Sequence, residues 1–380
     1  MNFNIDLTGY IENFVNYYIS EYQYLLESPK KYHLGKEEIA IIDLENPLVK
    51  EVKKFIQENN LLEKGVIISL SGGVDSMVLL AILIRLRTEK NFSIYVVSIN
   101  YNLRKESKFE ANFIKKYCRF YNIIFLVKDI DKTISNEDSQ RRIIDNGKLC
   151  KRSEYEEYSA DIRFKSYKYF LENRECKGVM VGHHKDDIIE NIFTNSMKGH
   201  NILDLEVMKK VSTKKDVQIF RPLLDFRKSE ILEFAHLYNI PYFLDTTPYW
   251  SRRGKMRNEI FPLFDEIFSP SWKNKFKEIG DQSNKWNDTI MNHLVEPWIK
   301  EASLLENKFI IPIKFTDDEN IWLFTLPKLF YKIGHNSIKK KSIIKLLNHI
   351  NNNDDNFKLT LDSGFVALIK DYNMTIQKEN

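Results

Sequence analysis

Short apolar runs alternate with longer amphipathic segments along the middle of the chain. The runs are rich in β-branched residues and too short for helices, as buried strands are, and the clearest are Val66–Leu70, Ser93–Ile99, Ile123–Val127 and Gly178–Val181. The segments between them carry apolar residues at helical spacing. This alternation predicts a parallel, doubly wound α/β sheet. Ligands of such sheets bind beyond the carboxyl ends of the strands.

The segments on either side of this pattern differ from it. Residues 1–45 are rich in Tyr and helical in pattern, and we expect an N-terminal helical extension that packs on the rest of the protein, in preference to a binding role. A helix over Leu48–Asn59 begins the α/β part, residues 46–268. The remaining residues, 269–380, predict a helical connector followed by a small α+β domain.

Two further stretches have their own patterns. In the C-terminal part, the elements that we expect after the connector are strands at Phe309–Phe315 and Ile321–Leu326, a basic helix over Ile338–Leu347, and a hairpin of Lys358–Leu361 with Gly364–Ile369. The polar stretch Asp131–Ser153 is poor in apolar residues. There we expect a mobile loop over a site or a contact with nucleic acid.

Composition narrows the class of protein. Hydrophobic residues make up 43% and charged residues 29% of the chain, which is ordinary for a globular protein with a packed core. A net charge of +4 permits a nucleic-acid partner without requiring one. The three cysteines, Cys118, Cys150 and Cys176, form no CxxC pair, which argues against a zinc finger, an iron–sulfur cluster or a disulfide framework. A reducing compartment fits this usage.

Membrane and export signals are missing from the sequence. No stretch approaches the length of apolar chain that spans a bilayer, and the N-terminus is acidic and aromatic rather than a basic-then-apolar leader. We therefore expect no membrane partner and a cytoplasmic protein, with an organelle as the alternative.

A glycine loop follows the first strand directly and leads into an apolar helix. It consists of Ser71, Gly72, Gly73, Val74, Asp75 and Ser76. Glycines let the backbone approach an anion closely, and the free N–H groups at the start of a helix point toward it. The serines can add hydroxyl donors, and Asp75 can hold Mg²⁺ against phosphates. A plain turn needs neither the serines nor the aspartate, so we favour a phosphate site. The spacing of the glycines differs from that of a Walker loop and from that of a dinucleotide fingerprint.

A second turn, after the strand Gly178–Val181, gathers imidazole and carboxylate groups. Its polar residues are His183, His184, Asp186, Asp187 and Glu190. One of the aspartates suits the cap of the helix that follows, but capping does not explain the whole set. Zinc is an alternative because His and Asp bind it, yet no third nitrogen or thiolate ligand lies nearby in the sequence. We favour chemistry on a magnesium-bound nucleotide.

Cations gather in three later segments. They are Arg221 in Arg221-Pro222-Leu223-Leu224, then Arg252, Arg253, Lys255 and Arg257, and finally Lys339, Lys340 and Lys341. Clusters of this kind bind phosphate groups or a nucleic-acid backbone. A solvated basic helix face is the alternative for the second and third segments.

Taken together, these motifs resemble those of the tRNA(Ile)-lysidine synthetase family of N-type ATP pyrophosphatases, whose nucleotide loop is called the PP-loop. The resemblance runs from about Val66 to Phe264 and continues weakly beyond. Three motifs carry it in order: Ser71–Ser76, the turn from His183 to Glu190, and Arg221-Pro222-Leu223-Leu224. Weaker matches are Asn100–Arg104, which fits an Asn-His-Gly-Leu-Arg turn in part, and the pair Arg253 and Arg257.

The resemblance implies a Rossmann-like PP-loop fold and a two-step reaction that uses ATP, Mg²⁺, free lysine and a tRNA with a CAU anticodon. In the first step the C2 carbonyl oxygen of the wobble cytidine attacks the α phosphate and pyrophosphate leaves. In the second step the ε-amine of lysine displaces AMP, with His184 as the candidate base. The implied roles are ATP binding by Ser71–Ser76 and Asn100, Mg²⁺ binding by Asp75, catalysis by Asp75, Arg104, His184, Asp186, Asp187 and Glu190, and tRNA binding by Arg221, Arg252, Arg253, Lys255, Arg257 and Lys339–Lys341.

Several positions depart from the family pattern. Tyr101 and Asn102 replace His and Gly, Ala160 replaces the first Arg of an Arg-x-x-Arg-Tyr helix, and Gly254 replaces an Asn. These changes lie where recognition of the amino acid and the tRNA is expected, so adenylation is better supported than lysine transfer. Three alternatives stay open: a tRNA thiolase of the same superfamily, whose paired cysteines are missing here, a homologue that binds nucleotide or RNA without catalysis, and an amide ligase.

Overall fold

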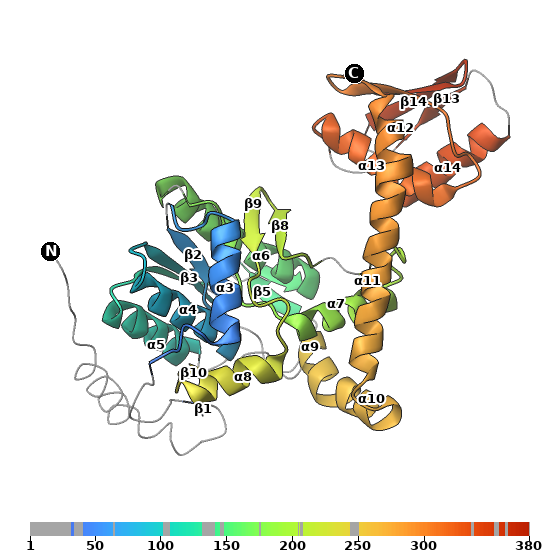
Figure 1. The fold of residues 1–380 in the computed structure, drawn as a ribbon. Coiled ribbons are helices and arrows are strands. Elements are labelled where there is room, and N and C mark those ends of the chain that lie inside the picture. The colour runs from blue at the N-terminus through green and yellow to red at the C-terminus, as the bar shows by residue number, and fades with distance from the viewer. Residues whose placement is uncertain are drawn as a thin grey trace. The chain divides into compact units, whose positions relative to one another are not determined.

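The computed structural model divides into two compact units, Met1–Gly199 with Glu206–Glu278, and His200–Leu205 with Ile279–Asn380 (Figure 1). The structure describes residues 32–33, 41–63, 65–101, 107–130, 141–144, 148–174, 176–203, 205, 208–243, 251–335, 338–352, 357–361 and 364–379. Most of the predicted extension, residues 1–45, lies outside this set. Its helical character stays a prediction, as do the predicted boundaries at residues 45 and 268.

The first unit is built on a six-stranded sheet with the order β4-β3-β2-β7-β9-β8. Its strands are β2 (Val66–Ser69), β3 (Ile94–Asn100), β4 (Ile124–Asp129), β7 (Val179–Met180), β8 (Val211–Lys214) and β9 (Val217–Phe220). Neighbours from β4 to β9 are parallel, and β8 runs antiparallel beside β9. The chain adds strands on one side of β2 and then returns to its other side, so the order reverses between β2 and β7. The predicted α/β sheet is confirmed.

Helices cover both faces of this sheet (Figure 1). They are α3 (Pro47–Glu58), α4 (Val74–Arg87), α5 (Ser107–Phe120), α6 (Arg152–Arg174), α7 (Lys185–Met197) and α8 (Lys228–Leu237). Side chains of α3, α4, α5 and α8 share one buried cluster with Ile68, whereas α6 packs with Ile67 in another. Neighbouring residues of a strand point to opposite faces, so a strand covered on both sides is apolar throughout. This is why the sequence of β2 shows no polar alternation.

Local signals set the start of helices α3 and α4. The Asn46 side chain accepts a hydrogen bond from the backbone N–H of Leu48 at 3.0 Å, and Pro47 occupies the first turn of α3, where its missing N–H removes no helical bond. Helix α4 begins after Gly73, whose backbone is extended. Because Gly73 has no side chain, it supplies no capping group to the first N–H groups of α4.

Two short antiparallel ribbons lie outside the main sheet. Strand β1 (Tyr32–His33) pairs with β10 (Tyr242–Phe243), and β5 (Arg141–Ile144) pairs with β6 (Lys148–Lys151). The second ribbon falls within the polar stretch Asp131–Ser153. The prediction of a loop is wrong for these strands, which pair with each other; Ile143 and Ile144 are β-branched residues of the kind that favours strands. Residues 131–140 lie outside the described residues.

A helical segment with a π turn closes the first unit. It comprises α9 (Arg252–Lys255), the π-helical η1 (Met256–Ile260) and α10 (Phe261–Phe268), and α11 (Trp272–Ile290) follows it. The backbone N–H of Phe261 bonds to the carbonyl of Met256, five residues back, immediately before Pro262. Pro262 has no N–H, and its ring crowds the carbonyl four residues earlier, so the wider turn accommodates the proline.

The second unit is built on a five-stranded antiparallel sheet with the order β11-β12-β15-β14-β13. Its elements are η2 (Met291–Val295), α12 (Glu296–Lys300), β11 (Ser303–Leu305), β12 (Lys308–Pro312), α13 (Glu319–Lys332), α14 (Lys340–Asn351), β13 (Lys358–Thr360), β14 (Phe365–Lys370) and β15 (Asn373–Lys378). Trp298, Trp322 and Phe330 lie in its core. The predicted α+β character and the β13–β14 hairpin are confirmed.

One predicted strand of this unit is wrong. Ile321–Leu326 lies inside helix α13, where Ile321, Trp322, Thr325 and Leu326 are buried at helical spacing. The apolar run looks like a strand because neither of its faces is polar.

Among the described residues, no helix of the protein is long and apolar enough to cross a membrane.

Candidate active site

The two predicted turns meet at the place where the strand order reverses. Strands β2 and β7 are direct neighbours, with Ile68 opposite Met180, and each turn follows the carboxyl end of its strand. The turn after β2 is the glycine loop Ser71–Ser76, and the turn after β7 carries His183 and His184. A crevice at this position is where open α/β sheets bind their ligands.

The glycine loop is held in a fixed curve by its own serines. The Ser76 hydroxyl donates to the carbonyl of Gly73 at 3.0 Å and accepts from the backbone N–H of Ser71 at 3.2 Å. Gly72 has a φ of +81°, and a Cβ built there would lie 2.6 Å from the ring of Phe243. A side chain at residue 72 would therefore be strained by both its backbone and its neighbour. The loop leads directly into the start of α4, a 14-residue helix.

Gly182 allows the second turn to touch the first. A Cβ at Gly182 would lie 2.9 Å from the carbonyl carbon of Asp75 and 2.9 Å from the backbone nitrogen of Ser76. No side chain fits at that separation, so glycine is required for the close approach of the two turns. None of the motifs includes this residue, although a glycine directly after an apolar strand is a signal of close backbone contact.

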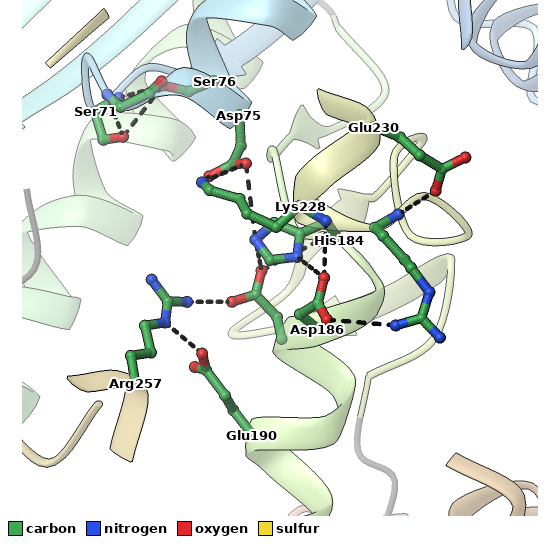
Figure 2. Close-up of polar contacts among 12 residues, drawn as sticks. Ser71, Asp75, Ser76, His184, Asp186, Glu190, Lys228, Glu230 and Arg257 are labelled. Carbon is green, nitrogen blue, oxygen red and sulfur yellow. Dashed lines mark hydrogen bonds and ion pairs between the residues drawn. The ribbon is translucent and has the colours of Figure 1, made fainter. Parts of the chain in front are cut away.

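His184 lies among three carboxylates (Figure 2). Its Nε2 is 3.7 Å from Oδ1 of Asp75 and 3.6 Å from Oδ2 of Asp187, and its Nδ1 is 3.7 Å from Oδ2 of Asp186. The imidazole is 2% exposed. Asp187 also caps helix α7, because its Oδ2 accepts from the backbone N–H of His184 at 3.1 Å. Asp187 thus both caps helix α7 and belongs to the carboxylate cluster, as the sequence allowed.

Lys228 joins the glycine loop to this cluster. Its Nζ donates to both carboxylate oxygens of Asp75, at 2.8 and 2.7 Å, and its backbone N–H donates to Oδ2 of Asp186 at 2.7 Å (Figure 2). No motif pointed to Lys228. A signal was present, because two cations, Arg227 and Lys228, stand at the start of helix α8, where the helix dipole disfavours positive charge unless acids lie nearby.

Two arginines close the other side of the cluster. Arg253 lies with its Nε 2.9 Å from Oε2 of Glu190 and with a terminal nitrogen 3.3 Å from Oδ1 of Asp187. Arg257, on the π turn, pairs with Glu190 and lies 3.0 Å from the same oxygen of Asp187. Burial alone raises the pKa of Asp187, but His184 and Arg253 outweigh it and lower that pKa to about 2. Asp187 is therefore ionised at neutral pH.

Arg221 is buried against His183. Its Nε donates to Nδ1 of His183 at 3.0 Å, and a terminal nitrogen donates to the carbonyl of Lys209 and to the hydroxyl of Ser212, each at 2.8 Å. Burial lowers the pKa of His183 to about 4; Asp187 opposes this shift and Arg221 adds to it. His183 is therefore neutral at pH 7, with its proton on Nε2.

Comparison with known proteins agrees with this geometry. A family model described as a PP-loop domain matches residues 44–264, more than half of the chain. The chain belongs to the PP-loop family. Curated relatives of the chain include the tRNA(Ile)-lysidine synthase of Clostridioides difficile, which is 27% identical over 274 residues, 70% of this chain and 55% of that protein. The tRNA(Ile)-lysidine synthase of Mycoplasma mycoides is 27% identical over 322 residues, 82% of this chain and 72% of that protein. The resemblance that the motifs indicated is confirmed.

Coverage of the relatives is partial. The chain spans about half the length of several of them, including the tRNA(Ile)-lysidine synthase of Thermosipho africanus, which is 29% identical over 57% of this chain and 48% of that protein. Among solved structures, a U34-tRNA thiolase from Methanococcus maripaludis is similar with a TM-score of 0.47 and 19% identity, over 65% of this chain and 79% of that one. That likeness carries no functional argument.

The crevice has the chemistry that a PP-loop nucleotide site needs. Gly73 leaves the first N–H groups of α4 without a side-chain cap, and such groups bind phosphate oxygens. The Asp75 carboxylate at the same helix start is a hard oxygen ligand suited to Mg²⁺, which takes one or two carboxylates together with phosphate oxygens. No group of three or more metal-ligating side chains forms a metal site of its own among the described residues. The Asp75 carboxylate therefore suits a metal ion that also binds phosphate oxygens.

The other predicted site residues are placed as follows. The buried Asn100 ends β3 and donates its side-chain amide to Oδ1 of Asp129 at 2.7 Å. Arg252 and Lys255 are exposed on α9, and Lys339–Lys341 are exposed at the start of α14 in the second unit. Arg104 lies outside the described residues. The roles assigned to these residues from the sequence stay predictions.

Proposed function

We propose that this protein is an ATP-dependent tRNA-modifying ligase that adenylates the C2 carbonyl of a wobble cytidine and replaces the AMP with lysine, forming lysidine. One observation carries the proposal: the glycine loop Ser71–Ser76 and the carboxylate–histidine turn lie against each other at the switch point of the sheet. The PP-loop family and the names of its relatives support the same reaction.

In the first step the protein would position ATP for attack at the α phosphate. The N–H groups at the start of α4 and the hydroxyl of Ser71 would hold the pyrophosphate portion, which leaves with the electron pair of the broken P–O bond. Mg²⁺ held by Asp75 would neutralise the charge that develops on the leaving group. The cytidine C2 oxygen then carries the AMP, which activates that carbon toward an amine.

In the second step the carboxylate cluster would bind the amino acid. Asp186 supplies the negative charge that an ammonium group requires. Asp187 and Glu190, which Arg253 and Arg257 neutralise, would offer carboxylate oxygens as further acceptors for the amine. The attacking ε-amine has to lose a proton, and His184 is the candidate base because its ring lies in the centre of the cluster. The amine forms the new C–N bond and AMP leaves with the former C2 oxygen.

Exposed cations would bind the RNA. Arg252, Lys255 and Lys339–Lys341 are exposed and can contact phosphates. Arg253, Arg257 and Arg221 already have partners inside the protein, since the first two neutralise Asp187 and Glu190 and the third holds His183. For these three we propose a positioning role in the crevice, together with the RNA contact that the sequence implied.

The cysteines give no support to sulfur transfer as a rival reaction. Burial raises the pKa of Cys118 to about 12 and that of Cys176 to about 11, so neither thiol is a ready nucleophile at neutral pH. The side chain of Cys150 lies outside the described residues.

Transfer of radiolabelled lysine to RNA tests the proposal. The full chain is incubated with ATP, Mg²⁺, labelled lysine and a tRNA with a CAU anticodon, and a tRNA with another anticodon is the control. We expect label only in the first RNA, with one AMP released for each lysine joined. ATP cleavage without label transfer would retain the adenylation chemistry and reject the substrate.

The Asp75→Ala variant extends the same assay. Because Asp75 would hold the metal at the leaving group, the variant is expected to lose AMP formation by a factor of at least about a hundred while it binds tRNA nearly as well as wild type. Unchanged turnover in this variant would exclude the role of Asp75 in the metal site.

A further inference from the structure

We propose that Lys228 acts as an exchangeable cation: it occupies the carboxylate of Asp75 while the nucleotide site is empty and transfers to the phosphates of ATP when Mg²⁺ takes its place. The inference rests on the proposed use of ATP and Mg²⁺ at the glycine loop, and it adds a role for a residue that no sequence motif pointed to.

The contact between the two side chains is direct and symmetric. The ammonium of Lys228 lies 2.8 and 2.7 Å from the two oxygens of Asp75, which is the separation of charge-assisted hydrogen bonds. Asp75 belongs to the first turn of α4, and Lys228 is the first residue of α8, so the pair bridges two helix starts. The side chains are 23% and 35% exposed, which leaves them open to an incoming ion.

The same contact excludes a metal ion. Mg²⁺ requires its oxygen ligands at about 2.0–2.1 Å, and an ammonium that bridges both oxygens of Asp75 occupies the position from which an ion would approach. Two cations at this carboxylate would also repel each other. Binding of Mg²⁺ therefore requires that Lys228 leave Asp75.

The backbone of Lys228 stays fixed while its side chain can move. Its N–H donates to Asp186 at 2.7 Å, and the backbone of the preceding residue, Arg227, is held by Glu230 at 2.7 Å. Four flexible methylene groups separate this anchored backbone from the ammonium. The ammonium can thus swing from Asp75 toward a phosphate held at the start of α4, in the same crevice, without a change in the fold.

Exchange of this kind would make metal binding depend on ATP. Without nucleotide, Mg²⁺ has to displace Lys228 and leave the ammonium without a partner. With ATP present, the phosphate oxygens ligate the metal and also give Lys228 a new partner, so each ligand assists the other. By linkage, ATP has to raise the affinity for Mg²⁺ by the same factor by which Mg²⁺ raises the affinity for ATP.

Binding of Mn²⁺, used as a paramagnetic probe for Mg²⁺, tests the exchange without any measurement of activity. For the nucleotide-free full chain, electron paramagnetic resonance should show that Lys228→Met binds Mn²⁺ about fivefold more tightly than wild type, a change on the scale of one partly exposed ion pair. Lys228→Arg should stay close to wild type because it keeps the charge. Asp75→Asn should abolish the gain in the double variant.

Arg227→Met is the matched control, because Arg227 is the neighbouring cation and lies 4.0 Å from Asp186 rather than on Asp75. Its Mn²⁺ affinity should equal that of wild type. An equal gain in Arg227→Met and Lys228→Met would overturn the proposal, since loss of any positive charge near the acids would then suffice. An unchanged affinity in a folded Lys228→Met would overturn it as well.

The second half of the exchange is measured with ATP. Calorimetry should show that Lys228→Met binds Mg-ATP about tenfold more weakly than wild type, although it binds the metal alone more tightly. Tighter Mn²⁺ binding with unchanged ATP affinity would reject transfer to the phosphates. Failure of the proposed function is distinct, because a protein that joins no lysine to RNA can still show both shifts, whereas a wild-type chain that binds no ATP rejects both proposals.

Discussion

Gly182 is the residue at which the glycine loop and the second turn come closest. A methyl group there would lie 2.9 Å from backbone atoms of Asp75 and Ser76, so one of the two turns has to move in Gly182→Ala. We expect a loss of about 1–3 kcal/mol in the free energy of unfolding, as for other overpacked sites, and a fall of at least about tenfold in ATP affinity. Urea unfolding and calorimetry measure the two effects.

Gly178→Ala is the control for this variant. A Cβ at Gly178 would lie 2.4 Å from the carbonyl oxygen of Gln218, within the same sheet but away from the loop. It should reduce stability while the folded protein keeps its ATP affinity. Equal ATP affinity in Gly182→Ala and wild type would show that the contact between the turns does not shape the nucleotide site.

His183 predicts a pH dependence of stability. Its pKa is lowered to about 4 in the folded protein, chiefly by burial, from an ordinary value of 6.5. Between these pH values the unfolded chain binds a proton that the folded protein does not, so stability falls as the pH drops from about 7 toward 4. The contribution of this residue amounts to at most about 3 kcal/mol.

Replacement by Asn tests the assignment, because an Asn side chain offers Arg221 an acceptor oxygen but does not titrate. Urea unfolding at pH 7.5 and pH 5 should show a smaller loss of stability in His183→Asn than in wild type. Parallel pH profiles for the two proteins would mean that another group carries the dependence.

Motifs identified the acids and histidines of the crevice but not the residues that arrange them. Asp75 and His184 stand in short, specific patterns, and their meeting follows from the adjacency of β2 and β7 at the sheet edge. Lys228 and Gly182 belong to no pattern, because their roles depend on contacts between turns far apart in sequence. The internal pairing of Arg253 and Arg257 could not be predicted either, since a basic run is equally suited to phosphate and to carboxylate partners.

At the scale of elements, two π turns stand next to prolines. In η1 the N–H of Phe261 bonds to Met256 immediately before Pro262, and in η2 the N–H of Glu296 bonds to Met291 immediately before Pro297. The common arrangement indicates that the proline causes the wide turn. Only the first of these turns carries a residue of the crevice, Arg257.

Pro262→Ala should therefore change the site through the helix. Alanine restores an N–H, so the wide turn can tighten to an α-helical one. Because an α turn holds one residue fewer than a π turn, Arg257 would then be rotated by about 100° relative to α10. Arg257 would lose Asp187 and Glu190, and we expect kcat/KM for AMP formation to fall about tenfold or more. Pro297→Ala, with the same local change in the second unit, should leave kcat/KM as in wild type. A similar effect of both variants, or of neither, would contradict this explanation.

The elements themselves show where patterns fail. Four strands of the first unit, β2, β3, β4 and β7, were predictable because a sheet covered on both faces requires continuous β-branched runs. The strands β8 and β9 of the same sheet were not among those predicted. The run Ile321–Leu326 has the same appearance as the predicted strands, yet it forms part of α13, because the next buried residues, Leu329 and Phe330, continue a helical spacing beyond Pro327. Pro327, directly after the run, argued for neither element, and tertiary packing decided.

At the scale of the whole molecule, RNA binding is proposed for both units. Reversal of charge at Lys339, Lys340 and Lys341 should weaken tRNA binding and reduce the slope of log affinity against log salt by up to about 0.9 for each phosphate that these lysines neutralise in the wild type. The ion pair of Lys340 with Glu319, at 3.1 Å, would be broken as well, with a cost in stability of at most about 1 kcal/mol.

Lys358, Lys370 and Lys378 provide a matched control, because they are also exposed lysines of the second unit. Their reversal changes the net charge by the same amount and should alter tRNA affinity much less. Filter binding over a range of salt concentrations measures both triple variants. Equal weakening by the two sets would show that α14 is a solvated face and that total charge governs binding.

The central claim, that the protein activates a base carbonyl with ATP, is tested most directly by following the oxygen atom. A tRNA with a CAU anticodon is prepared with ¹⁸O at C2 of the wobble cytidine and incubated with the full chain, ATP, Mg²⁺ and lysine. Because the C2 oxygen bonds to the α phosphorus and leaves with it, mass spectrometry should find the ¹⁸O in the phosphate of AMP. Unlabelled AMP, with the ¹⁸O retained in the tRNA, would contradict this claim.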